Sequence, residues 1–254
     1  MFYTAVAETD VGIVKKTNQD SVLIKHGKYK GKEVLLAVIC DGMGGLAEGE
    51  IASATVVDEF SKWFDSELIN ELSNTDMNVI GNKFSVMLKE LNVRISEYAK
   101  SRELRMGTTF TGALFVDDYF VTVHVGDSRL YYINNRVDQL TEDQTFVARE
   151  IKRGNMTIEQ AKTDKRRNML LQCVGASDNL EPDVFTGKAQ GGTYMLCSDG
   201  FRHELTQNEI RINFDPNILS DKNVMHVNAR KLIEMVKSRN EKDNISVILI
   251  KVIV

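Results

Sequence analysis

The sequence predicts an α+β fold arranged as a four-layer αββα sandwich, in which two antiparallel sheets pack together and helix pairs flank them. Short runs rich in β-branched and aromatic residues are separated by tight turns, which favours antiparallel pairing. These runs bracket two helical blocks without the regular strand–helix–strand alternation that is typical of a parallel sheet.

The chain has the size of one large domain. It contains 254 residues, of which 43% are hydrophobic, so it can bury a sizeable core. Only Pro182 and Pro216 occur as prolines, and no glycine- or serine-rich tract separates two halves. We therefore expect a single catalytic domain over residues 1–254.

Three strands and two long helices are predicted in the N-terminal part. The strands cover residues 3–7, 21–25 and 34–40, with a turn around residues 27–31, where glycines permit positive φ. From residue 48 to 64 and from 77 to 98, apolar residues recur every three or four positions. That spacing predicts two amphipathic helices.

A second block of strands follows. Residues 108–116, 119–125 and 130–134 read as strands separated by the Asp117-Asp118 and Gly126-Asp127 turns. Residues 141–167 are polar and weakly helical, which predicts a surface excursion with short helices. A strand at 193–198, a helix at 224–236 and a last strand at 245–252 complete the fold.

Charge and composition exclude several classes of protein. Lys and Arg number 32 and Asp and Glu 36, a net charge of −4, which argues against nucleic acid as the main partner. The apolar stretches 34–40 and 245–254 are shorter than the roughly 20 residues of a membrane helix, and no signal peptide is seen. Cys40, Cys173 and Cys197 have no disulfide or zinc spacing, so we expect a reducing compartment, the cytoplasm.

Acidic residues stand where several predicted strands end. Asp41 and Asp199 each follow a strongly apolar strand and precede a glycine, while Asp127 and Asp243 lie in similar turns. Any one of these could be an ordinary turn. Buried carboxylates need partners, however, and magnesium or manganese prefers carboxylate, carbonyl and water oxygens. The joint pattern therefore predicts a binuclear metal site, to which Gly42 could add its carbonyl oxygen.

Taken together, these residues resemble the PPM-type (type 2C) metal-dependent protein serine/threonine phosphatases, particularly the short bacterial members. The resemblance covers essentially the whole chain, and the motifs occur in the family's order. They are Asp10-x-Gly12, Asn18-Gln19-Asp20-Ser21, Asp41-Gly42-Met43-Gly44-Gly45, Gly107-Thr108-Thr109, Gly126-Asp127-Ser128-Arg129, Ser198-Asp199-Gly200 and Asp243-Asn244-Ile245-Ser246.

The resemblance implies two divalent cations, manganese or magnesium, in a cleft at one end of the sandwich. Asp41 matches the bridging carboxylate and Gly42 the carbonyl ligand, while Asp199 and Asp243 match the remaining ligands of the first metal. Asp20 matches an acidic residue that holds metal-bound waters. Asp127 resembles the ligand of a third, weakly bound cation that it shares with Asp199, and Asn244 would support Asp243.

The chain departs from the family pattern at three positions. Lys15 stands where many members have an arginine that contacts the substrate phosphate, and it offers a point charge instead of a two-pronged contact. Lys16 could take that role instead, or both could be solvated surface lysines. Gln19 replaces a glutamate of some members, so the second metal would rely more on water and Asp20. Met43 replaces a histidine that eukaryotic members carry and that is proposed as the general acid.

The remaining candidates are ambiguous. No histidine is an obvious proton donor: His124 reads as packed within a strand, and His26, His203 and His226 as surface residues, so a metal-bound water could donate instead. Cys40 and Cys197 read as small buried hydrophobic residues. A basic cluster could attract phosphopeptides or could be a solvated face; it comprises Arg149, Lys152, Arg153, Lys162, Lys165, Arg166 and Arg167.

The resemblance implies direct hydrolysis of phosphoserine and phosphothreonine in proteins by a water that bridges the metals. A single acid or base contributes about 10²–10⁴-fold, far below what phosphate monoesters require, so the metals must carry most of the acceleration. No phosphate-cradling loop surrounds a cysteine nucleophile.

The expected partners are phosphorylated proteins and a cognate serine/threonine kinase, and the chain is expected to be a monomer. The alternative is a pseudophosphatase that serves as a binding scaffold, against which the retained aspartates argue.

Overall fold

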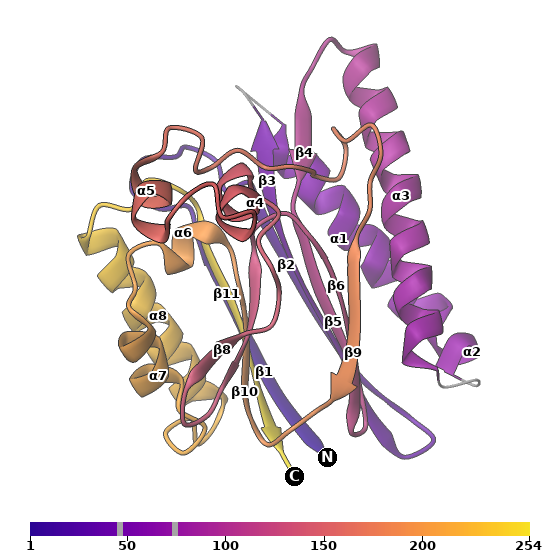
Figure 1. Cartoon of the computed structure of the whole chain (residues 1–254). Helices are drawn as coiled ribbons and strands as arrows, with labels where there is room; N and C mark the ends of the chain where they lie inside the picture. The colour runs from indigo at the N-terminus through magenta and orange to yellow at the C-terminus, as the bar shows by residue number, and fades with distance from the viewer. Residues whose placement is uncertain (45–47, 73–75) are drawn as a thin grey trace.

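The computed structural model describes residues 1–44, 48–72 and 76–254, and it confirms the four-layer sandwich (Figure 1). Helices α1 and α3 cover one sheet, helices α7 and α8 cover the other, and the two sheets face each other between them. Gly45 of the predicted glycine-rich motif lies outside the described residues.

The first sheet joins the beginning and the end of the chain. Strand β1 pairs antiparallel with β11 along its whole length, from Phe2 opposite Ile253 to Asp10 opposite Ile245. Both termini therefore lie side by side at the end of the sandwich that is opposite to α4, α5 and α6 (Figure 1). In spatial order the sheet contains β1 (Phe2–Asp10), β11 (Ile245–Ile253), β10 (Gly192–Cys197), β7 (Arg129–Ile133) and β8 (Val137–Gln139).

The second sheet begins with a long hairpin. The predicted turn around residues 27–31 is shorter in the structure, because β2 continues through Gly27 and only Lys30 and Gly31 turn, with φ of 49° and 79°. Two positive φ angles are typical of the tight hairpin turns that match strand twist. In spatial order the sheet contains β2 (Asp20–Tyr29), β3 (Lys32–Gly44), β5 (Phe110–Val116), β6 (Tyr119–Val125) and β9 (Asp183–Lys188), while β4 (Met106–Thr108) pairs with the end of β3.

The helices begin at well-defined caps. The Asp76 and Asp221 side chains accept hydrogen bonds from backbone N–H groups of α3 and α8, and Thr206 forms a capping box with Glu209 at α7. None of the described helices is both long and apolar enough to cross a membrane. The helices are α1 (Gly49–Ser66), α2 (Leu68–Glu71), α3 (Met77–Ser101), α4 (Phe146–Lys152), α5 (Ile158–Thr163), α6 (Asp199–Arg202), α7 (Gln207–Phe214) and α8 (Lys222–Ser238).

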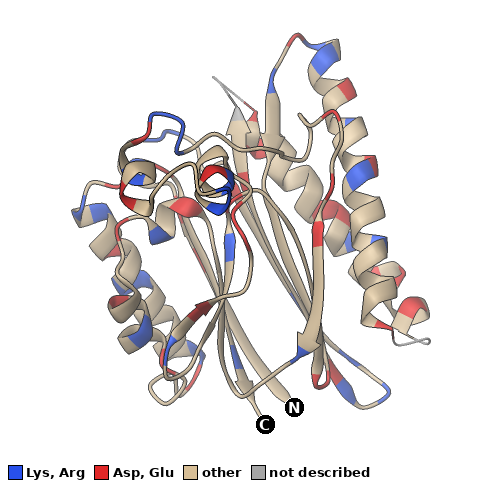
Figure 2. Ribbon diagram, viewed as in Figure 1, with Lys and Arg blue, Asp and Glu red and all other residues tan. Residues whose placement is uncertain are grey.

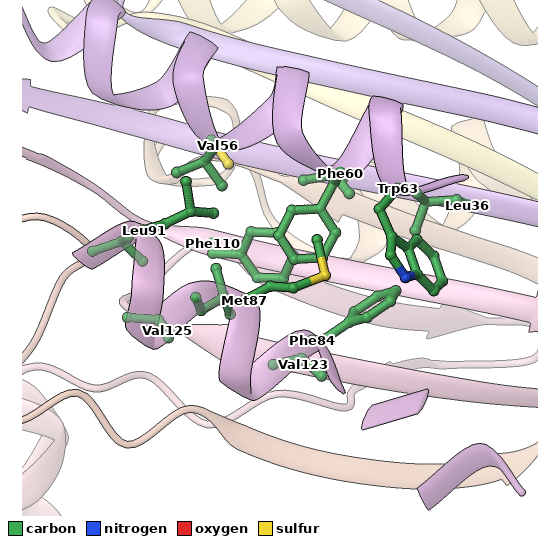
Figure 3. Close-up of a cluster of buried hydrophobic side chains, with 14 of the residues drawn as sticks. Leu36, Val56, Phe60, Trp63, Phe84, Met87, Leu91, Phe110, Val123 and Val125 are labelled. Atoms are coloured by element: carbon green, nitrogen blue, oxygen red, sulfur yellow. The ribbon is translucent and has the colours of Figure 1, made fainter. Parts of the chain in front are cut away.

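Three apolar layers hold the sandwich together, and β3 contributes to two of them. Leu36, Val38 and Cys40 face α1 and α3, while the alternate residues Leu35 and Ile39 face the other sheet. The layer beneath α1 and α3 is rich in aromatic rings, as Figure 3 shows around Phe60, Trp63, Phe84 and Phe110. This two-sided burial explains why residues 34–40 are continuously apolar.

The buried cysteines behave as predicted. Cys40 and Cys197 are fully buried in two different layers, and burial raises the pKa of both thiols, that of Cys197 to about 12. Both are small apolar side chains of the core and not nucleophiles.

Candidate metal centre

Several strands end or begin at one end of the sandwich and bring the predicted aspartates together. Asp20 begins β2 and lies opposite Asp41 of β3 in the strand register. Asp199 starts α6 after β10, and Asp243 precedes β11, the neighbour of β10. Asp127 lies in the turn between β6 and β7. All five acidic residues thus come from strand ends that the sequence predicted.

These carboxylates repel one another in a buried environment. Burial raises the pKa of Asp41 well above its usual range, and the charges of the other four aspartates add to the effect. Burial and the charge of Asp199 also raise the pKa of Asp20 and of Asp127 to about 7, although Ser198 and Ser246 act against the rise at Asp20. Positive charge between these side chains would stabilise their ionised, carboxylate form.

Two oxygens of the cluster lack partners. Asp20 Oδ2 accepts a hydrogen bond from Ser198 Oγ at 3.0 Å, but Asp20 Oδ1 and Asp199 Oδ1 are buried without a hydrogen-bond partner. Buried oxygens of this kind are suited to bind a hard cation such as magnesium or manganese, which prefers oxygen donors. Within the described ranges, no three His, Cys, Asp or Glu side chains are arranged to hold a metal ion by themselves, so a cation here would need backbone oxygen and water to complete its coordination.

Gly42 allows three backbone segments to cross beside Asp41. Its N–H donates to Gln19 O at 3.1 Å, and a Cβ at this position would lie 2.3 Å from Gly49 O and 2.5 Å from Gln19 O. Any side chain would push β3, the start of β2 and the start of α1 apart. The requirement for glycine in this motif is thus a matter of space.

Asn244 ties the N-terminal loop to the centre. Its Oδ1 accepts from Gln19 N at 2.9 Å, and its Nδ2 donates to Val11 O at 2.9 Å. Its own N–H donates to Asp243 Oδ1 at 2.9 Å. Asn244 therefore orients Asp243 and fixes the loop that carries Lys15.

Lys15 lies at the centre, whereas Lys16 does not. The Nζ of Lys15 is 2.9 Å from Asp243 Oδ1, and its side chain is 39% exposed. Burial lowers its pKa, but the hydrogen bond and charge of Asp243 outweigh this and leave the pKa raised. Lys15 also lines a cavity of about 880 Å³ together with Asp127, Asp199 and Asp243, and Lys16 does not.

Arg202 and His203 are cavity residues that the sequence reasoning missed. His203 is exposed, as expected, and it also lines the cavity: its Nε2 lies 3.7 Å from Asp199 Oδ2 and its Nδ1 3.5 Å from Glu241 Oε2. Arg202 Nη2 donates to Asp127 O at 3.2 Å. Arg202 and His203 follow Asp199 by three and four positions, respectively. This spacing places side chains on the same face of a helix, so the sequence did contain a signal for both residues.

The predicted excursion at residues 141–167 carries α4 and α5 and covers the cavity. We call residues 145–171 the flap. In Figure 2, acidic and basic residues are interspersed along α4, α5 and α6 at this end of the molecule. Val147, Ile151 and Ile158 line the cavity from the flap side, so its wall there is partly apolar.

Gln144 holds both ends of the flap against the turn that carries Asp127. Its Oε1 accepts from Gly126 N at 2.8 Å and from Gln172 Nε2 at 2.9 Å. Its backbone N–H donates to Gly126 O, and its backbone carbonyl accepts from Leu171 N, both at 2.8 Å. Gln144 thus joins the start of the flap, its end and the turn that carries Asp127.

Comparison with known proteins agrees with this geometry. The sequence profile described as protein phosphatase 2C matches residues 13–236. The chain belongs to the protein phosphatase 2C family. Protein phosphatase PhpP of Streptococcus pneumoniae is 30% identical over 95% of this chain and 94% of its own length. Serine/threonine phosphatase stp of Listeria monocytogenes is 31% identical over 96% and 93%.

Solved structures of protein phosphatase 2C relatives share the whole fold. Serine/threonine phosphatase Stp1 from Staphylococcus aureus superimposes with a TM-score of 0.86 at 29% identity, covering 100% of this chain and 96% of that chain. The catalytic domain of PstP in complex with two manganese ions superimposes with a TM-score of 0.79 at 28% identity, over 99% of both chains. The predicted family and its dependence on divalent metal are therefore confirmed.

Proposed function

We propose that this chain hydrolyses phosphoserine and phosphothreonine in proteins at the cavity lined by Lys15, Asp127, Asp199 and Asp243. The observation that carries the proposal is the cluster of five mutually repelling aspartates with two unpartnered buried oxygens. Asp41, Asp199 and Asp243, with the Gly42 carbonyl, would hold one divalent cation. Asp41 would also reach a second cation, whose waters Asp20 would hold.

Two bound divalent cations supply an acidified water and neutralise the charge of the phosphoryl oxygens during in-line attack. The chain's own residues position the reacting groups around them. Lys15, fixed by Asp243, places an ammonium group where a phosphate oxygen can bind. No cysteine is among the cavity-lining residues, so we propose direct hydrolysis without a phosphoenzyme.

The test is a time course of hydrolysis with manganese, magnesium or EDTA, using p-nitrophenyl phosphate and a phosphothreonine peptide. Metal-dependent turnover of both substrates, abolished by EDTA, is the expected result. Metal binding without any turnover would instead favour a pseudophosphatase.

The biological setting follows from the same features. We propose that the substrates are phosphorylated proteins of the cytoplasm and that a serine/threonine kinase phosphorylates them. The three free cysteines fit a reducing compartment. We also propose that the chain acts as a monomer. A third cation at Asp127 and Asp199 stays a prediction, and the charge of Arg202 bears on it.

Lys15→Ala is expected to lower kcat/KM for both substrates at least tenfold, because an ammonium group that binds the phosphate is lost. Lys15→Arg should retain most activity or improve it, since arginine can bind phosphate through two N–H groups. Lys16→Ala is the matched control, and steady-state kinetics decide. An unaffected Lys15→Ala combined with a damaged Lys16→Ala would transfer the role to Lys16.

Arg167→Glu on the flap is expected to impair turnover of a phosphoprotein more than turnover of p-nitrophenyl phosphate, because Arg167 lines the cavity that only the larger substrate fills. Arg166 is a different case: it pairs with Asp164 at 2.9 Å and stacks on Phe146 at 4.1 Å, so Arg166→Glu should mainly disturb the flap.

The difference between the substrates should shrink as salt rises, since charges are screened over about 8–10 Å at physiological ionic strength. Kinetics of Arg167→Glu at low and high salt test this. Equal losses for both substrates would indicate damage to the metal centre, and no loss would make the basic cluster a solvated face.

A further inference from the structure

The turn that carries Asp127 has a fixed positive charge beside it. Arg202 Nη2 lies 3.8 Å from Asp127 Oδ2 and also donates to the Asp127 carbonyl at 3.2 Å. The Arg202 side chain is only 12% exposed, so bulk solvent screens this charge weakly. Arg202 is also the fourth residue of α6, which begins at Asp199.

Arg202 is available to Asp127 because its other acidic neighbour is already neutralised. Asp143 Oδ2 lies 3.6 Å from Arg202, but both oxygens of Asp143 accept hydrogen bonds from Arg129, each at 2.6 Å. This two-pronged contact balances the charge of Asp143. Arg202 thus lies beside both carboxylates, and Asp127, unlike Asp143, has no second arginine among the ion pairs of the described residues.

Asp127 and Asp199 line the same cavity, and Asp199 Oδ1 has no partner, so a cation could bind between them. We propose that Arg202 is a built-in cation that weakens divalent-ion binding at the Asp127–Asp199 position, so that the chain holds two ions tightly and a third one poorly. A divalent ion there would face the fixed charge of Arg202 across a poorly solvated gap. The inference rests on the proposed function, because it requires the main metal centre to exist.

The guanidinium cannot easily move away to admit an ion. The Arg202 side chain is largely buried, and its Nη2 donates a hydrogen bond to the Asp127 carbonyl. The side chain is thus packed in place and not swung out into the cavity. Without Arg202, the net charge around Asp127 and Asp199 would be more negative by one unit, which would favour binding of a divalent cation.

The test counts bound Mn²⁺ by equilibrium dialysis and by the electron paramagnetic resonance signal of free Mn²⁺, with no activity assay involved. Wild type is expected to bind two ions before a much weaker third. Arg202→Met, which keeps the length of the side chain and removes its charge, should tighten the third step at least tenfold, which corresponds to about 1.4 kcal/mol. Adding Asp127→Asn to that variant should remove the gain.

Further variants separate charge from packing. Arg202→Lys keeps the charge and should behave as wild type, and Arg202→Gln is a second neutral variant should Arg202→Met fail to fold in a melting experiment. Arg167→Met is the matched control, because Arg167 also lines the cavity but donates to Lys162 O. It should leave the third step unchanged.

Two results would overturn the inference: a third ion bound by wild type as tightly as the first two, or neutral variants at Arg202 that bind the third ion no more tightly than wild type. Failure of wild type to bind any Mn²⁺ would be distinguishable, because it would remove the proposed metal centre itself.

Discussion

Asp199→Asn is expected to abolish turnover while the chain stays folded. The substitution keeps the shape of the side chain but removes one negative charge from the cation site. Changes to groups that only orient a metal ligand cost about 10–100-fold, so loss of a ligand's charge should exceed that. Asp199 also raises the pKa of Asp41 and Asp127 by repulsion. The metal-free variant should therefore melt at the wild-type temperature or above it.

The measurements are hydrolysis of p-nitrophenyl phosphate with manganese, and a melting curve in EDTA. Asp118→Asn is a suitable control, because Asp118 lies in the turn between β5 and β6, away from the strand ends that carry the cluster. Near-wild-type activity of Asp199→Asn would contradict the assignment of Asp199 as a ligand. A large drop in the melting temperature without metal would instead make Asp199 a structural residue.

Gly42→Ala is expected to damage both stability and activity. The added Cβ would meet two backbone oxygens, Gly49 O at 2.3 Å and Gln19 O at 2.5 Å, and neither can rotate away as a side chain would. Overpacking of this kind costs about 1–3 kcal/mol of unfolding free energy. Displacement of the backbone beside Asp41 by about 1 Å should lower kcat/KM about 100-fold.

Gly27→Ala provides the comparison for this substitution. Gly27 lies in β2, its φ is not in the positive region, and an added Cβ would meet only Phe64 atoms at 3.8 Å or more. It should be neutral or slightly stabilising. Chemical denaturation measures the stability and Mn²⁺-dependent kinetics the activity. A Gly42→Ala protein with normal stability and activity would show that the backbone crossing can relax.

The sequence predicted the layers of the fold because burial on both faces leaves a strong pattern. Residues 34–40 are apolar throughout since they contact helices on one side and a sheet on the other. Strand β9 was not predicted, because Asp183–Lys188 is a short edge strand with mixed polarity and mostly exposed residues. Helix α7 was missed for a similar reason: its apolar residues cover too few turns.

At the site, the aspartates were predictable because each lies at or near the end of a strand, in a recognisable motif. Residues whose role depends on contacts with parts of the chain that are distant in sequence could not be predicted. Gln144 is one polar residue in a polar segment, and only the folded chain shows that it contacts both Gly126 and Gln172. His203 is exposed, as the sequence predicted, but its place beside the cavity was missed, because its contact with Glu241 joins residues that are far apart along the chain.

The contacts of Gln144 make the flap an exchangeable module. Because Leu171 N donates to Gln144 O at 2.8 Å, the two ends of the segment are held together in the folded chain, independently of what lies between them. Lengthening a closed loop is thermodynamically mild, at about 0.6 kcal/mol for each doubling. Insertions or replacements between these anchors would leave the strand ends and their aspartates where they are. Substrate choice and hydrolytic chemistry can thus diverge independently within one chain.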